Sequence, residues 1–112
     1  MTVYDAAHHL ANAIKESEEF IQFRKLEKEV KSTPELKDMV EDFQKRQFEL
    51  QGMQLQGQPI EEEKMKKLEE LFSVINRDPK AAEYFQAELR FNQMMGDVSK
   101  ILGDAMGIGD EE

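Results

Sequence analysis

Residues 78–105 read DPKAAEYFQAELRFNQMMGDVSKILGDA. Asp78 directly before Pro79 predicts a helix start, because an aspartate side chain caps free N–H groups and proline suits the first helical position. Apolar residues then recur at steps of three and four for about three heptads, which is the spacing of one helix face. They are Tyr84, Phe91, Met95, Val98, Leu102 and Ala105, interrupted only at Glu88. The segment therefore predicts one long helix that reaches Ala105.

A second apolar line runs beside the first in the same segment, at Phe85, Leu89 and Ile101. A helix with two adjacent apolar lines has more surface to bury than one neighbouring helix covers. We therefore expect this helix to lie centrally in a bundle or against a second copy of the chain. The residues expected in a homo-oligomeric interface are Tyr84, Phe91, Met95, Val98 and Leu102.

Further helix starts precede this segment. Thr33-Pro34 repeats the pattern of a capping side chain before proline, and Gln58-Pro59 is a weaker version of it. Gly52, Gly57 and the glutamines between Gln51 and Gln58 predict a loop or hinge before that second start. Helix-spaced apolar residues follow both starts, so we expect helices from about residue 34 and over about 59–77.

The N-terminal third is also helical in pattern. Thr2 with Asp5 three residues later resembles a capping box, and Ser17 followed by two glutamates predicts a second start. The pattern leaves open whether residues 3–32 form two helices or one bent helix. The sequence contains neither a run of alternating β-branched residues nor an Asn-Gly or Asp-Gly hairpin turn, so it predicts no strand.

The expected fold is all-α, an antiparallel bundle of four to five helices with a long C-terminal helix, and we expect a dimer because so much apolar surface needs covering. At 112 residues the chain is one domain at most. We place that single helical domain at residues 1–106. Residues 107–112 lose periodicity and gain acidic residues, which predicts an acidic flexible tail.

The composition limits the kinds of partner that this chain can bind. A formal net charge of −9 disfavours direct nucleic-acid binding, which usually begins at a basic patch. No stretch approaches the roughly 18 apolar residues of a membrane span, and the N-terminus has no secretory signal pattern. We therefore expect a cytoplasmic protein with no membrane contact, whose partners are a second copy and another protein.

Catalytic constellations are absent from the sequence. There is no cysteine, so thiolate chemistry and thiolate metal sites are excluded. Adjacent helical residues such as His8 and His9 point about 100° apart and do not hold one metal together. No serine lies in a Gly-x-Ser-x-Gly elbow. The acidic clusters have no other functional group beside them in a pattern that would form a catalytic site. We expect a non-enzymatic protein without a cofactor or a metal.

The leading hypothesis is a non-enzymatic helical adaptor or regulatory protein that acts through protein–protein interaction, and two other functions compete with it. In a small-molecule or metal-binding bundle, Tyr84, Phe91, Met94 and Met95 would line an apolar pocket. An enzyme with dispersed carboxylates is the third possibility, and the sequence supplies little support for its geometry.

Several segments resemble the YlbF/YmcA family of small bacterial proteins, and its YheA-like subgroup in particular. The N-terminal segments are Val3-Tyr4-Asp5-Ala6-Ala7 and Leu10 through Phe20. Pro34-Glu35-Leu36, Phe43-Gln44-Lys45 and Asn76-Arg77-Asp78-Pro79 follow in the family's order. The resemblance covers nearly the full length of the chain.

The resemblance implies an all-helical, dimeric cytosolic protein of Bacillus-like bacteria. Relatives in this family are linked to competence, sporulation and biofilm control, within a protein complex that influences ribonuclease Y and messenger-RNA processing. These relatives are adaptors rather than enzymes, so no catalytic residues carry over. Some of them use cysteines to help hold iron–sulfur clusters, and this chain departs from that pattern because it has no cysteine.

Overall fold

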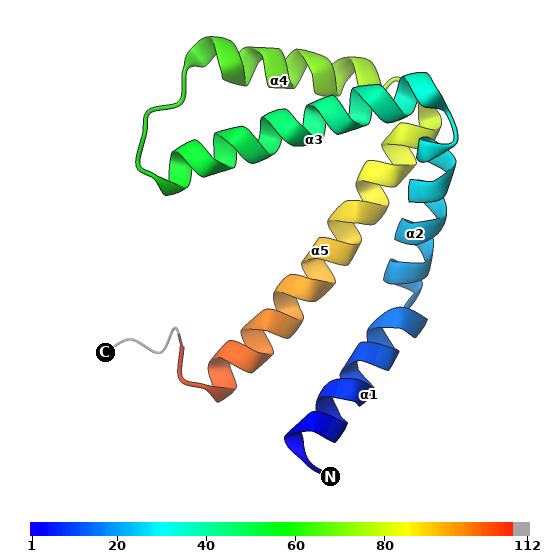
Figure 1. Cartoon of the computed structure of the whole chain (residues 1–112), viewed down its shortest axis with the longest axis vertical. Coiled ribbons are helices and arrows are strands. Elements are labelled where there is room, and N and C mark those ends of the chain that lie inside the picture. The colour runs from blue at the N-terminus through cyan, green and yellow to red at the C-terminus, as the bar shows by residue number, and fades with distance from the viewer. Residues whose placement is uncertain (109–112) are drawn as a thin grey trace. The chain divides into compact units, whose positions relative to one another are not determined.

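The chain folds into five α-helices. The computed structural model describes residues 1–108, and within that range it contains no β-strand (Figure 1). The helices are α1 (Val3–Glu16), α2 (Glu18–Lys31), α3 (Pro34–Leu55), α4 (Glu62–Ile75) and α5 (Pro79–Ala105). The all-α prediction, with four to five helices and a long C-terminal helix, is confirmed.

Side-chain caps or a first-turn proline explain where three of the helices begin. At the start of α1, the Thr2 side chain accepts from the Asp5 N–H at 3.1 Å and the Asp5 carboxylate accepts from the Thr2 N–H at 3.2 Å, which completes the predicted capping box. At the start of α5, Asp78 Oδ1 accepts from the N–H groups of Lys80 and Ala81 at 2.9 and 3.2 Å. Pro34 opens α3 after Thr33, whose side chain makes no capping hydrogen bond.

Ser17 separates α1 from α2, so residues 3–32 form two helices. Its backbone is extended, and its Oγ donates to the Ile14 carbonyl at 2.6 Å and accepts from the Phe20 N–H at 3.2 Å. One side chain thus satisfies a carbonyl at the end of α1 and an N–H at the start of α2, the groups that helix ends leave unpaired.

The boundary between α3 and α4 differs from the prediction. Residues Gln51–Leu55, expected in a loop or hinge, continue α3, and Gly52 lies inside the helix. The start expected near Pro59 comes later, at Glu62, after Glu61, which makes no side-chain capping bond. Gly57, with φ of 74°, turns the chain between the two helices, a backbone conformation that glycine adopts without strain.

A glycine also ends α5. Gly107 has φ of 77°, and the N–H of Ile108 donates to the Gly103 carbonyl at 2.8 Å while the N–H of Gly107 donates to Asp104 at 3.2 Å. This is the Schellman pattern, which satisfies carbonyls at the end of a helix. Of the acidic tail predicted over 107–112, residues 109–112 lie outside the described residues.

The packing divides the chain into two compact units, which are described separately. Unit 1 contains Met1–Leu26 and Phe85–Glu112, and unit 2 contains Glu27–Tyr84. The division falls within α2 and within α5. The single domain at 1–106 stays a prediction.

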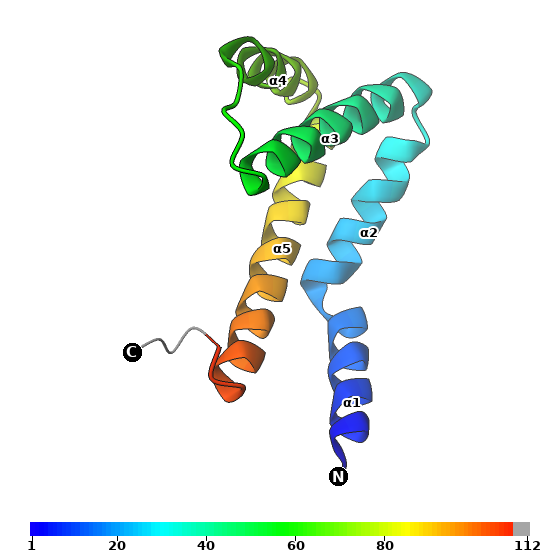
Figure 2. The same cartoon turned by 60° about the vertical axis from the view of Figure 1, so that its left-hand side comes forward.

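Unit 2 holds most of the buried apolar side chains. In it α3 and α4 run side by side in opposite directions, as Figures 1 and 2 both show. The rings of Phe43 and Phe72 meet between these helices with centroids 5.5 Å apart, and Gln44 Nε2 donates to the Tyr84 hydroxyl at 3.1 Å. The buried members are Val30, Leu36, Val40, Phe43, Leu50, Ile75, Ala81 and Tyr84.

Candidate functional site: an association surface on unit 1

An aromatic cluster joins α2 to α5 in unit 1. Phe91 of α5 stacks on Phe23 of α2 with ring centroids 5.2 Å apart and an interplanar angle of 6°. Phe20, one turn earlier on α2, meets the same Phe91 ring at 5.7 Å in a tilted arrangement. The guanidinium of Arg24 lies 6.0 Å from the Phe20 ring centroid, at the edge of cation–π range. Phe91 is therefore one residue of α5 that holds α2.

The remainder of unit 1 is thinly covered. Its buried apolar side chains among the described residues are Leu26 and Ala87, and α1 has none. The apolar residues of α1 are exposed or half-buried, with Val3 84% and Tyr4 80% exposed. An amphipathic helix with an uncovered apolar face loses the burial that normally stabilises it.

The end of α5 is equally uncovered. Ile101, Leu102, Met106 and Ile108 are 67, 50, 67 and 65% exposed. In Figures 1 and 2 the start of α1 and the end of α5 lie at the same end of unit 1. Each of these two helix ends presents exposed apolar side chains, and exposed apolar patches on a small protein mark places of association.

The residues expected at an interface have different surroundings. Tyr84 is 4% exposed within unit 2, where it accepts the hydrogen bond from Gln44. Phe91, Met95 and Val98 are half-buried in unit 1, and Leu102 is half-exposed. The sequence did not single out Phe20 and Phe23, although their i,i+3 spacing on α2 was a usable signal.

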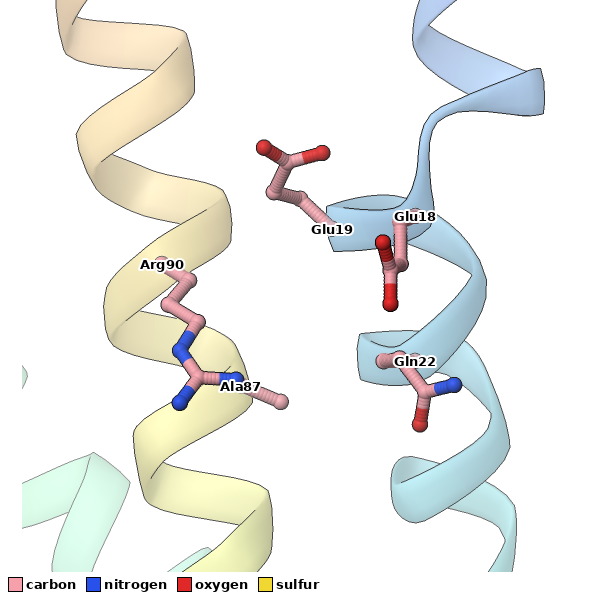
Figure 3. Close-up of a pocket in the computed structure, with 5 residues that line it drawn as sticks. All are labelled: Glu18, Glu19, Gln22, Ala87 and Arg90. Atoms are coloured by element: carbon pink, nitrogen blue, oxygen red, sulfur yellow. The ribbon is translucent and has the colours of Figure 1, made fainter.

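A shallow pocket lies between α2 and α5 in unit 1, and Figure 3 shows the five residues that line it. Glu18, Glu19 and Gln22 come from α2, and Ala87 and Arg90 come from α5. Its volume of about 190 Å³ is below the roughly 300–1,000 Å³ of small-molecule sites. None of Tyr84, Phe91, Met94 and Met95 lines it, so this pocket is not the one that the small-molecule hypothesis requires.

Metal-binding geometry is missing from the described part of the chain. No three His, Asp or Glu side chains in residues 1–108 are grouped so that they could hold an ion. His8 and His9 lie exposed on α1. Within the same residues, none of the helices combines the length and apolar character that crossing a bilayer requires.

Similar proteins place this arrangement in a family. A UPF0342 protein of Caldicellulosiruptor saccharolyticus is 38% identical over 109 residues, which is 97% of this chain and 91% of the relative. A UPF0342 protein of Symbiobacterium thermophilum is 40% identical over 106 residues, 95% of each chain. A solved structure, titled a protein of unknown function (DUF964) from Bacillus stearothermophilus, has the same fold. It superposes with a TM-score of 0.80 at 19% identity, covering 93% of this chain and 91% of that one.

The family model described as "Control of competence regulator ComK, YlbF/YmcA" matches residues 3–107, which spans all five helices. The resemblance noted from the sequence segments is thereby confirmed. This chain belongs to the YlbF/YmcA family.

Proposed function

We propose that this protein is a non-enzymatic, homodimeric adaptor that acts through protein–protein contacts in bacterial developmental or messenger-RNA processing control. The observation that carries the proposal is the uncovered apolar surface of unit 1. The family description concerns control of a regulator, which agrees with a role in regulation.

The contrast in burial between the two units supports an association through unit 1. Within residues 1–108, all but two of the buried apolar side chains belong to unit 2. Burial of apolar area contributes roughly 25 cal/mol per Å², so exposed side chains such as Val3, Ile101 and Met106 contribute little in an isolated chain. A second protein that covers these side chains would supply the missing apolar burial. Every copy of the chain presents the same uncovered side chains.

The charge distribution permits two copies to approach at this surface. The charged residues within 1–15 are Asp5 and Lys15. Those within 91–103 are Asp97 and Lys100. Each segment is therefore formally neutral, and the net charge of −9 resides on the remainder of the chain. Two acidic chains repel each other least where both surfaces are neutral.

A second copy is the partner that fits a surface present on every molecule. A two-fold contact pairs the same patch on both chains, and such dimers are the commonest oligomers. In the proposed dimer the ends of α1 and α5 from the two copies form a helix bundle. Met95, Val98 and Leu102 lie in that contact with Val3 and Tyr4. Phe91 adjoins it, and Tyr84 is already covered in unit 2.

Crosslinking tests this arrangement cleanly because the chain has no native cysteine. A single cysteine at Leu102→Cys, treated with a short bis-maleimide at low protein concentration, is expected to give a covalent dimer. Val74→Cys is the matched control, since Val74 in unit 2 is 46% exposed and Leu102 is 50% exposed. Equal yields from the two variants, or no dimer from Leu102→Cys, would count against the proposal.

A further inference from the structure

The helix α1 receives little support from the rest of its own chain. None of its residues is buried, and of the described helices only α3 and α4 form an extensive pair. An isolated helix shorter than about 12–15 residues is marginal in water, and α1 has 14 residues. Most helices in proteins are stabilised by packing of their apolar face. The packing that stabilises α1 is therefore to be expected from another molecule.

Interactions within α1 do not replace the missing packing. The capping box between Thr2 and Asp5 is exposed, and a cap of this kind favours a helix by about fivefold. The charged residues of α1 are Asp5, Lys15 and Glu16, so no acid precedes a base by four residues to form an ion pair along the helix. Local interactions thus fix where α1 begins and leave its stability marginal.

The junction at Ser17 allows α1 to unfold without disturbing α2. Ser17 Oγ accepts from the Phe20 N–H at 3.2 Å, and the Ser17 carbonyl accepts from the Ile21 N–H at 3.0 Å. Both bonds belong to the first turn of α2, and neither requires α1 to be helical. The stack of Phe23 on Phe91 also holds α2 to α5. Unfolding that begins in α1 would therefore end at Ser17.

We infer that α1 forms as a helix only together with the dimer, so that folding of residues 3–16 and association of two copies are one coupled step. This inference rests on the proposed dimer, in which a second copy covers the apolar side chains of α1. The surface that the second copy offers is the exposed end of α5, at Ile101, Leu102 and Met106. Residues 1–15 and 91–103 are each formally neutral, so charge does not oppose the contact. In the monomer α1 is unfolded, and α2 to α5 remain helical.

Coupled folding makes the dimer responsive to conditions. Association then includes the entropy cost of ordering α1 in both copies, which weakens the dimer relative to one built from preformed helices. Any change that stabilises or destabilises the helical form of α1 alters the dissociation constant of the dimer. The N-terminal segment is thus unfolded when the protein is dilute and helical when two copies are paired.

Hydrogen exchange followed for each helix separately tests the coupling. The dissociation constant is first measured by sedimentation of full-length protein carrying a fluorescent label at Val74→Cys, an exposed position in a chain without native cysteine. Exchange of the wild-type protein is then followed by mass spectrometry above and below that concentration. The amides of α1 are expected to be protected in the dimer and to exchange as an unfolded chain in the monomer, while those of α3 and α4 stay protected in both.

Two cap variants distinguish coupled folding from a helix that is already formed in the monomer. Thr2→Ala removes the side chain that accepts from the Asp5 N–H, so each copy loses about fivefold in helix formation and the dissociation constant is expected to rise about 25-fold. Asp78→Ala removes the corresponding cap of α5, which is helical in monomer and dimer alike. This control is expected to lower the melting temperature and to leave the dissociation constant within about twofold of wild type.

Several results would overturn the inference. They are α1 amides that stay protected in the monomer, α1 amides that are unprotected in the dimer, a Thr2→Ala dissociation constant equal to that of wild type, and a wild-type dissociation constant below about 1 nM. A wild-type chain that never dimerises contradicts the proposed dimer itself and this inference with it. The mass measured by sedimentation separates that failure from the others, in which a dimer is present and only the coupling is wrong.

Discussion

Phe91 and Phe23 stack face to face, with ring centroids 5.2 Å apart and an interplanar angle of 6°. Their contact joins α5 to α2 in a unit that has few fully buried side chains. Each half-buried ring therefore contributes a large share of the packing in unit 1.

We expect Phe91→Ala to lower the free energy of unfolding by about 2–4 kcal/mol, at or below the usual range for a buried phenylalanine because Phe91 is only half-buried. Phe23→Ala should cost a similar amount, and the double variant should cost less than the sum because the two rings touch. Denaturant titration of the four proteins measures this coupling. Strict additivity would show that the stack contributes nothing beyond the area each ring buries.

Ser17→Ala tests the break between α1 and α2. The substitution removes the hydroxyl that accepts from the Phe20 N–H, and caps of this kind stabilise by about 1 kcal/mol. Ser99→Ala, at an exposed position inside α5, should change stability by much less. The comparison requires the free energy of unfolding for both variants. Equal effects would mean that the Ser17 cap is not stabilising.

One chemical change should have opposite effects at two glycines. Gly52→Ala should stabilise the chain by about 0.5–1 kcal/mol, since Gly52 is helical and has space for a methyl group. Gly57→Ala should destabilise it by about 1 kcal/mol, since Gly57 has φ of 74°. Melting temperatures of the two variants settle the signs. A stabilising Gly57→Ala would contradict the role assigned to its backbone conformation.

RNA binding should be negligible. With a net charge of −9, the chain has too few free basic side chains to contact several phosphates together. Filter binding or fluorescence anisotropy with a mixed-sequence RNA at about 150 mM salt measures this directly. A dissociation constant in the micromolar range would show a local basic surface that the sequence and the described residues do not reveal.

The sequence predicts a helix start well where the interactions that fix it lie within a few residues along the chain. The starts at Thr2, Ser17 and Asp78 were predictable because a side chain caps N–H groups two or three residues away. The start of α4 was predicted only approximately, because the proline signal at Gln58-Pro59 precedes Glu62 and Glu61 makes no capping bond that would mark the first helical residue. Gly52 was read as a break because glycine disfavours helices, yet α3 continues past it alongside α4.

The candidate surface was predictable only in outline. The apolar spacing of α5 located Phe91, Met95, Val98 and Leu102 on one side of a helix, as the helical period requires. The same pattern could not show that Tyr84 is covered within unit 2, or that Phe20 and Phe23 meet Phe91. Those contacts join residues far apart in the chain, and periodicity carries no information about which faces meet.

The central claim is that unit 1 forms a homodimer, and light scattering combined with circular dichroism over a protein dilution series tests it most directly, since mass and helicity are then followed together. The wild-type chain is expected to have twice the 13.0 kDa mass of one copy. Leu102→Glu is expected to lose the dimer or the fold, because it places an unpaired charge in the contact, and the similarly exposed Val74→Glu is expected to keep both. A wild-type chain that stays helical and monomeric at high micromolar concentration, or a Leu102→Glu variant with unchanged mass and stability, would contradict the account.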